Sequence, residues 1–314
     1  MLGNFFPVFY AFVFILTILL IFKKKGQVLL GASALLITLP GVLRILPVRL
    51  SGGVADKGLK VMTWNVGLMN YDAPDKETAI RKNQVIFDAI QTSNADIVCL
   101  QEFFTAVIPD STYNFIDRIR AMGYPYHYFS RDNPKFEKKF FFGNILFSKF
   151  PVTDSSRYPF GSEPSASLIR AGIIIGTDTV DVITGHYQNI SYEKDDNKIS
   201  VSVGKLSQVK QGFSDQVTQA RVTRDVYRAS KRKIIFCADL NTISTSYLYR
   251  KVKHELNDAW LHGGFGLGAT YQSSIPGIRI DHIFYSPQFT CTGAETLVTS
   301  SSDHNAVLAT FNLK

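Results

Sequence analysis

Six short polar motifs punctuate this chain of 314 residues, and each follows a run that is typical of a β-strand. Together they hold carboxylates, carboxamides and imidazoles, the groups that metal-assisted hydrolysis requires. One such motif could arise by chance, but six of them predict a single site assembled from the strand ends of a whole sheet. The motifs are Trp64-Asn65, Gln101-Glu102, His186, Asp239-Leu240-Asn241, Asp281-His282 and Ser302-Asp303-His304.

Residues 1–50 have the pattern of a membrane anchor. Residues 5–22 and 28–43 carry no charged side chain, and the second run stays largely apolar to residue 48. Because about 20 apolar residues span a bilayer as a helix, we expect two transmembrane helices, over 5–22 and 28–48. A cleaved signal peptide followed by a spacer is the alternative. Residues 51–58 would then link the anchor to one domain over residues 59–314.

The segment Lys23–Lys25 joins the two apolar runs and predicts their orientation. Basic loops tend to stay in the cytoplasm. Both ends of a two-helix hairpin lie on the same side, so residues 51–314 would face away from the cytoplasm. Basic residues after the second run argue weakly for the opposite orientation.

The anchor also changes the meaning of the net charge, which is +8 for the whole chain. Residues 1–50 contain five basic residues and no acidic one, which leaves +3 for the rest. The high isoelectric point is therefore poor evidence for nucleic-acid binding, which usually shows a concentrated basic face. In residues 59–314 strands dominate and helices punctuate them, a pattern that predicts two packed sheets with helices outside.

Glu102 and Asn65 are the candidate metal ligands in the first half of the domain. Glu102 ends an apolar strand, and a carboxylate facing a cleft suits Mg²⁺, which prefers one or two carboxylates together with water and phosphate oxygens. Taken alone, Glu102 could equally cap a loop. Asn65 offers an oxygen and an amide donor, so it fits either a second ligand or a support for Glu102.

Asp239 and Asn241 lie two residues apart after a strand, and on an extended chain their side chains would share one face. Asp239 could then hold a water nucleophile, and Asn241 could donate to a phosphoryl oxygen. An Asx turn is the structural alternative for any D-x-N sequence.

His186 and His304 are candidate acids, bases or phosphate contacts, because histidine titrates near neutral pH and a carboxylate can orient its ring. Asp281 is the natural candidate to orient His304, and Asp303 could reach the metal region. Arg170 could clamp a phosphate through two hydrogen bonds, or it could be an ordinary surface residue.

The motifs resemble those of the endonuclease/exonuclease/phosphatase superfamily, which includes pancreatic-type deoxyribonuclease, abasic-site endonucleases, sphingomyelinases and inositol-polyphosphate 5-phosphatases. The resemblance covers residues 59–313 in family order. The motifs that carry it are TWNVG (63–67), LQE (100–102), GNILFSKFPV (143–152), GHYQ (185–188), ADLNT (238–242), RIDHIFYS (279–286) and SSDHNAV (301–307).

This resemblance implies a four-layer α/β sandwich of two mainly antiparallel sheets flanked by helices. It also implies hydrolysis of a phosphate ester with Mg²⁺ or Mn²⁺. The implied metal residues are Asn65, Glu102 and Asp303, and the implied substrate-phosphate contacts are Arg170 and Asn144. The implied catalytic residues are His186, Asp239, Asn241, Asp281 and His304.

Three functions remain open at the level of sequence. The first is a phosphodiesterase acting on nucleic acid, and the second is a lipid-directed enzyme of sphingomyelinase or phosphoinositide-phosphatase type. The third is a binding module without catalysis, which the full set of chemical residues disfavours. The tethered domain is similar to bacterial membrane-bound members, so we expect the inner membrane with the domain in the periplasm, bilayer contact through the N-terminal helices and no obligate protein partner.

Overall fold

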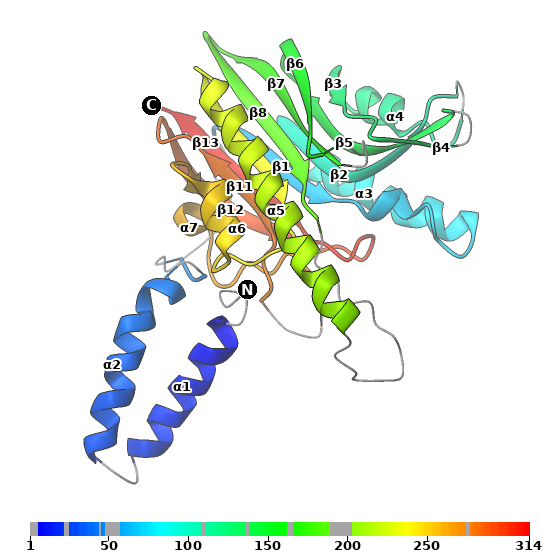
Figure 1. Ribbon diagram of the computed structural model, residues 1–314. Helices are drawn as coiled ribbons and strands as arrows, with labels where there is room; N and C mark the ends of the chain where they lie inside the picture. The colour runs from blue at the N-terminus through cyan, green and yellow to red at the C-terminus, as the bar shows by residue number, and fades with distance from the viewer. Residues whose placement is uncertain are drawn as a thin grey trace.

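The computed structural model describes residues 6–21, 25–43, 45–47, 57–108, 111–135, 138–161, 166–188, 203–273 and 277–314. Two β-sheets lie face to face at its centre, with helices on their outer sides (Figure 1). Each sheet is mixed, with one parallel pair of strands among antiparallel neighbours. The predicted α/β sandwich of two sheets flanked by helices is confirmed.

The first sheet has seven strands in the order β12-β13-β1-β2-β5-β3, with β4 paired to β5. Its only parallel pair among the described residues is β1 with β2. The strands are β1 (Leu59–Asn65), β2 (Ile97–Ala106), β3 (Tyr126–Phe129), β4 (Asn133–Lys135), β5 (Phe140–Ser148), β12 (Phe289–Leu297) and β13 (Ala306–Leu313).

The second sheet has six strands in the order β10-β11-β9-β8-β7-β6, and its parallel pair is β8 with β9. The strands are β6 (Val152–Pro159), β7 (Ser167–Ile175), β8 (Asp178–His186), β9 (Lys233–Asp239), β10 (Asn257–Asp258) and β11 (Asp281–Tyr285). In both sheets the parallel pair has an antiparallel strand on each side. These flanking strands are β13 and β5 in the first sheet and β11 and β7 in the second.

Alternating residues of each strand separate three apolar clusters. In β1, Val61 packs between the sheets, whereas Met62 and Trp64 pack outward. The outward side chains of the first sheet meet α3 (Lys76–Ser93) and α4 (Phe115–Ala121). Those of the second sheet meet α5 (Val203–Ala229) and α6 (Tyr247–Lys253), and α7 (Ala259–Gly263) packs at the edge near β12. Burial of each large apolar side chain stabilises this arrangement by roughly 1.5–3 kcal/mol.

The helix α3 shows how local sequence sets the element bounds. Asp75 accepts a hydrogen bond from the Thr78 backbone N at 2.7 Å and caps the first turn. Asn94 ends the helix in a left-handed conformation, with φ of 47°. The apolar side chains of one helical face, including Ile86 and Ile90, are buried against the first sheet.

The N-terminal residues form two helices side by side, α1 (Phe6–Ile21) and α2 (Lys25–Val42) (Figure 1). Within the described residues, none of the helices combines the length and the apolar character needed to cross a membrane. The predicted transmembrane helices over 5–22 and 28–48 are therefore not confirmed. One physical reason is length, because the 16 residues of α1 extend only about 24 Å, less than the roughly 30 Å of a bilayer core.

Part of the predicted linker, residues 51–56, lies outside the described residues, and so do residues 23 and 24 of the basic segment. The division into anchor, linker and domain stays a prediction. Many side chains of α1 and α2 are exposed and apolar, among them Phe9 at 70% and Ile37 at 79%.

Candidate active site

Strand alternation directs the motif residues into the space between the sheets. In β9, Ile235 and Cys237 pack in the inter-sheet core, so Asp239 points to the same face. In β8, Val180 and Val182 also pack in the inter-sheet core, so His186 points to that face as well. The polar residues thus continue the inner face of each sheet where the apolar core ends.

The registers then bring these ends together. Asn65 lies opposite Gln101 in the parallel pair of the first sheet, and His186 lies opposite Asp239 in that of the second. Asp281 also pairs with Asp239, from the antiparallel neighbour β11. The polar ends of the two parallel pairs, β1–β2 and β8–β9, therefore face each other across the sandwich.

Asn65 connects the two sheets at this point. Its Nδ2 donates to Glu102 Oε1 at 3.0 Å and to Asp239 Oδ2 at 3.0 Å. Its Oδ1 accepts a hydrogen bond from Gly67 N at 3.0 Å. Of the two predicted roles, the geometry favours the support of Glu102, because the amide donors of Asn65 hold two carboxylates in place.

Glu102 owes its position to an irregularity in β2. The register with β5 shifts between Leu100 and Phe103, and Glu102 has φ of 48° within that bulge. A left-handed conformation is unfavourable for a residue with a Cβ, and strained residues of this kind cluster at functional sites. The bulge turns the carboxylate out of the sheet, and 31% of the side chain is exposed.

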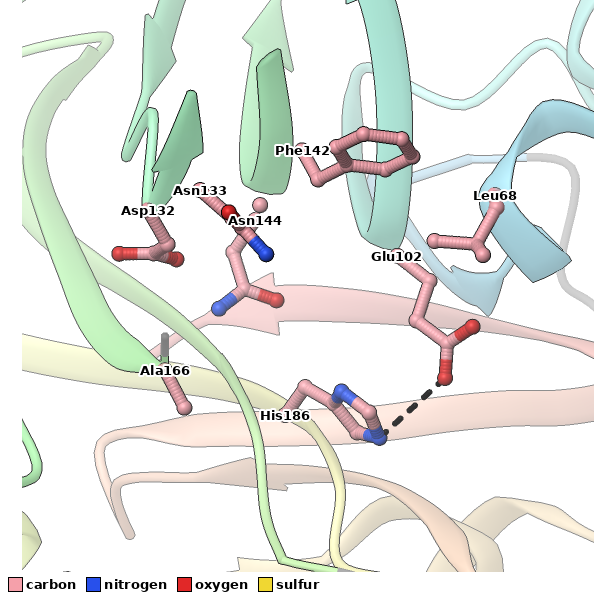
Figure 2. A pocket seen from close by; sticks show the side chains of 9 residues that line it. Leu68, Glu102, Asp132, Asn133, Phe142, Asn144, Ala166 and His186 are labelled. Atoms are coloured by element: carbon pink, nitrogen blue, oxygen red, sulfur yellow. Dashed lines mark ion pairs between the residues drawn. The ribbon is translucent and has the colours of Figure 1, made fainter. Parts of the chain in front are cut away.

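His186 faces Glu102 at the mouth of the site (Figure 2). Its Nε2 lies 3.5 Å from Glu102 Oε1 and 3.6 Å from Asp239 Oδ2. Asn241 Nδ2 lies 3.0 Å from the same nitrogen and donates to the Tyr187 carbonyl at 2.8 Å. Asn241 therefore fixes the ring of His186 relative to the two carboxylates.

The predicted geometry of Asp239 and Asn241 is wrong, although both residues reach the site. Asn241 has φ of 48°, so the chain is not extended there. Asp239 Oδ1 accepts from Asn241 N at 2.9 Å, which is the Asx-type alternative considered for this motif. The turn brings the Asn241 side chain back to His186.

Asp281 and His304 form the expected pair, with His304 Nδ1 2.9 Å from Asp281 Oδ2. Burial and the nearby Asp239 carboxylate raise the pKa of Asp281 to about 6, against the lowering effect of His304. Burial alone would lower the pKa of His304, but the carboxylates of Asp281 and Asp239 raise it to about 10. At neutral pH the pair is therefore an imidazolium and a carboxylate.

Asp303 lines a polar pocket of about 400 Å³ on one side of Glu102. Lys82, Asp72 and three consecutive serines, Ser300–Ser302, also line this pocket. The predicted metal residues Glu102 and Asp303 thus share one cavity, although no hydrogen bond joins them within the described part of the chain.

Arg170 lies elsewhere. It is on β7 opposite Ile183, three positions before His186 along β8. Its Nη1 donates to Asp181 Oδ1 at 2.7 Å and its Nη2 to Asp154 Oδ1 at 2.6 Å. Because Arg170 donates to carboxylates of its own sheet, its geometry does not support the predicted phosphate contact.

Asn144 does lie near the site, in a second pocket that also contains Glu102 and His186. Its Nδ2 donates to the Ser167 carbonyl at 2.8 Å, so this donor is not directed at a phosphate. The predicted phosphate contact of Asn144 therefore conflicts with the geometry.

A layer of uncharged residues below the site was not predicted. Gln101 Nε2 donates to Thr63 Oγ1 at 3.0 Å and to Thr184 Oγ1 at 2.8 Å, and so joins the two sheets. Ser302 Oγ donates to the Asn65 carbonyl at 2.7 Å. Strand alternation indicates this layer. Thr63 and Thr184 precede Asn65 and His186 by two residues, so their side chains lie on the same face of each sheet.

The donor set fits a divalent cation. Carboxylate oxygens of Asp239 and Asp281 and a ring nitrogen of His304 lie within 4.8 Å of one another, and the two carboxylates could hold a cation while His304 stays protonated. Asp281 Oδ1 is buried and accepts no hydrogen bond from the described residues. Among those residues no lysine or arginine pairs with Glu102, Asp239 or Asp281, so a cation would offset their charge. Oxygen-rich sites of this kind suit Mg²⁺ or Mn²⁺.

The sequence profile of the Endonuclease/Exonuclease/phosphatase family matches residues 62–304. The chain belongs to this family. Its members are divalent-metal-dependent hydrolases, so the chain is an enzyme that acts on phosphate ester bonds. The predicted superfamily is confirmed.

Solved structures show the same fold. An endonuclease/exonuclease/phosphatase from Beutenbergia cavernae is 21% identical, with a TM-score of 0.59, over 82% of this chain and 72% of that one. A mannosyl-6-phosphatase from Bacteroides thetaiotaomicron is 17% identical, with a TM-score of 0.57, over 81% and 100%. The catalytic domain of human Nocturnin with bound sulfate is 17% identical, with a TM-score of 0.59, over 84% and 97%. The search of curated proteins finds no match.

Proposed function

We propose that this protein hydrolyses a phosphodiester with Mg²⁺ by in-line attack of water. The observation that carries the proposal is the meeting of Glu102, Asp239 and Asp281 from two sheets with only amide and imidazole partners among the described residues. Bound at these carboxylates, the metal would supply charge stabilisation to the phosphoryl group and activate water.

In this proposal the protein residues have separate tasks. Asp239 orients the attacking water, while Asn65 holds Asp239 and Glu102 at a fixed separation. His186, oriented by Asn241, faces the phosphoryl oxygens. His304, kept protonated by Asp281, offers positive charge beside Asp239, with its Nε2 3.9 Å from Asp239 Oδ2.

The test uses the full chain with Mg²⁺ or with EDTA on plasmid DNA, abasic-site duplex, RNA, sphingomyelin and a phosphoinositide. Glu102→Gln and His304→Gln should lose turnover and remain folded. Asp154→Asn is the matched control, because it removes a carboxylate from the outer face of the second sheet. Hydrolysis that is equal in all four proteins, or equal in EDTA, would refute the proposal.

A nucleic acid is the first candidate substrate of this phosphodiesterase, and a lipid is the second. The exposed apolar side chains of α1 and α2 favour it, because contiguous apolar surface of this kind commonly marks a membrane or protein contact. Salt distinguishes the two candidates, since binding to a nucleic-acid backbone weakens steeply as salt rises.

We also propose that the chain associates with a membrane through α1 and α2, with its catalytic part in the periplasm of a bacterium. The support is the apolar surface of these helices and the basic segment between them in the sequence. Flotation of the full chain with liposomes, compared with residues 57–314, tests this association. Equal flotation of both would contradict it.

A further inference from the structure

A cavity of about 280 Å³ opens directly beside the candidate catalytic residues (Figure 2). Glu102 and His186 form part of its wall, and Figure 2 shows the Glu102 carboxylate pointing toward the His186 ring. The volume is well above the roughly 30 Å³ share of one water molecule. A group of modest size that is bonded to a phosphate at the catalytic residues therefore has room to enter.

The wall of this cavity is mainly apolar. Leu68, Phe142 and Ala166 contribute to it, and none of the described lining residues is a lysine or an arginine. The separate polar pocket, with Lys82 and Asp303, lies beyond Leu68 and Glu102, which line both cavities. The two sides of Glu102 thus differ in chemistry.

Leu68 is held in this position by an unusual turn. All four residues of Gly67–Asn70 have φ between 51° and 54°. Asn70 Nδ2 donates to Asn83 Oδ1 of α3 at 3.0 Å, which ties the turn to the helix. A left-handed conformation is unfavourable for each residue with a Cβ, so the wall between the two pockets is held against local strain.

Asp132, the other carboxylate in the wall, is neutralised within the protein. It accepts from Ser130 Oγ at 2.6 Å, from Ser167 Oγ at 2.5 Å and from Arg157 Nε at 2.8 Å. Its side chain is only 2% exposed. It therefore does not require a cation in the cavity, and it fixes the serines around Asn144.

Asn144 provides an acceptor without a partner. Its backbone N donates to Ser130 Oγ at 2.8 Å, and its Nδ2 donates to the Ser167 carbonyl at 2.8 Å. The reverse amide orientation would place two oxygens together, so the network fixes Oδ1 on the other side. Oδ1 is buried and accepts no hydrogen bond from the described residues, a condition that normally costs free energy.

We infer that this cavity binds the alcohol portion of the phosphate ester, and that its preferred occupant is an uncharged, largely apolar alcohol with one hydroxyl or amine donor for Asn144 Oδ1. The inference rests on the proposed phosphoesterase function. A polynucleotide fits the cavity poorly, because each further nucleotide brings a phosphate charge and the described wall holds no cation to match it.

The test compares methyl, hexyl and 6-hydroxyhexyl esters of phosphate, each as the monoester and as the methyl diester, with the full chain and Mg²⁺. We expect kcat/KM to be at least about tenfold higher for hexyl than for methyl. We expect a further gain of about three- to tenfold for 6-hydroxyhexyl over hexyl, as one hydrogen bond provides.

Two variants separate the contributions. Ala166→Leu should lower the hexyl-to-methyl ratio, because the added methyl groups occupy the cavity. Asn144→Leu should bring the 6-hydroxyhexyl-to-hexyl ratio to about one, whereas a purely structural role would lower both rates equally. Ala229→Leu, at an exposed position near the end of α5, adds the same groups far from the cavity and should change neither ratio.

Three results would overturn the inference. They are equal rates for hexyl and methyl esters, ratios in Ala166→Leu that match those of Ala229→Leu, and a hydroxyl preference that persists in Asn144→Leu. If Asn144→Leu does not fold, the Ala166→Leu ratios still decide the case. Failure of the proposed function looks different, since no ester, including bis(p-nitrophenyl) phosphate, would then show hydrolysis that depends on Mg²⁺ and Glu102.

Discussion

The second sheet carries a cluster of carboxylates that contrasts with the one in the site. In this outer cluster, Asp154 and Asp181 meet Arg170 and Arg232, so two negative groups face two positive ones. The hydrogen bond from Arg232 is the main reason that the pKa of Asp154 lies at about 2. Every carboxylate there has its counter-charge in the chain.

The site cluster consists of Glu102, Asp239, Asp281, His186 and His304, and it lacks that balance. Its carboxylates share an amide and two imidazoles, and burial raises the pKa of Asp281 instead of lowering it. The difference shows that acidic residues alone do not identify the site. What distinguishes the site is an excess of negative charge, because three carboxylates meet the His304 imidazolium but no lysine or arginine among the described residues.

The largest effect is expected when one charge is removed from the site cluster. Glu102→Gln should lower kcat by at least about a hundredfold, the usual scale for losing one group that stabilises the transition state. The free energy of unfolding should stay the same or rise, because repulsion within the site decreases. Turnover assays with urea unfolding measure both, and a variant that keeps its rate would contradict the assignment.

A smaller loss is expected when the carboxylates stay and their support is removed. Asn65→Ala leaves Glu102 and Asp239 without the donor that separates them, and supporting residues of metal sites typically contribute about 10- to 100-fold. The apparent affinity for Mg²⁺ should weaken in the same variant. An unchanged Mg²⁺ titration would show that Asn65 does not position the ligands.

The converse change in the outer cluster should affect stability alone. Asp181→Asn leaves Arg170 and Arg232 with one carboxylate and Ser230 with a weaker acceptor. We expect a loss of about 1–3 kcal/mol in the free energy of unfolding, with kcat unchanged in the folded protein. A fall in kcat with stability preserved would mean that the outer cluster belongs to the site.

The smallest effect concerns pH. Because the folded protein raises the pKa of His304 to about 10, above the ordinary value of about 6.5, the imidazolium stabilises the fold fully below that ordinary value. This stabilisation is lost as pH rises through about 10. In EDTA, the difference in unfolding free energy between the wild type and His304→Gln should therefore shrink from pH 6.5 to 10, and a constant difference would contradict the ion pair.

Sequence predicted the location of the site because alternation along strands is a strong rule. Asn65, His186 and Asp239 each continue an inward-facing row, and the Asp281–His304 pair was expected and is present. The start of α3 also follows from local sequence, because the Asp75 side chain caps its first turn.

Other features depend on contacts that no local pattern reveals. The bulge at Glu102 arises from the pairing of β2 with β5, and the left-handed turn at Leu68 places bulky residues in a conformation that their propensities disfavour. The partners of Arg170, Asp154 and Asp181, come from neighbouring strands, so no local pattern indicates them. The Asn144 side chain donates to the carbonyl of Ser167, which is 23 residues away and equally invisible to a local pattern.

The pairing of β1 with β13 has a practical consequence for handling this enzyme. Leu59 lies opposite Phe311, whereas Thr63 and Val307 meet near the other end of the pair, beside Asn65. The chain thus enters and leaves the sandwich at one corner, about 20 Å along the strand from Asn65. A reporter protein or surface tether fused after Lys314 would leave the substrate entrance open, and a short peptide between residues 313 and 59 would close the sandwich into a ring that could be reopened in another loop.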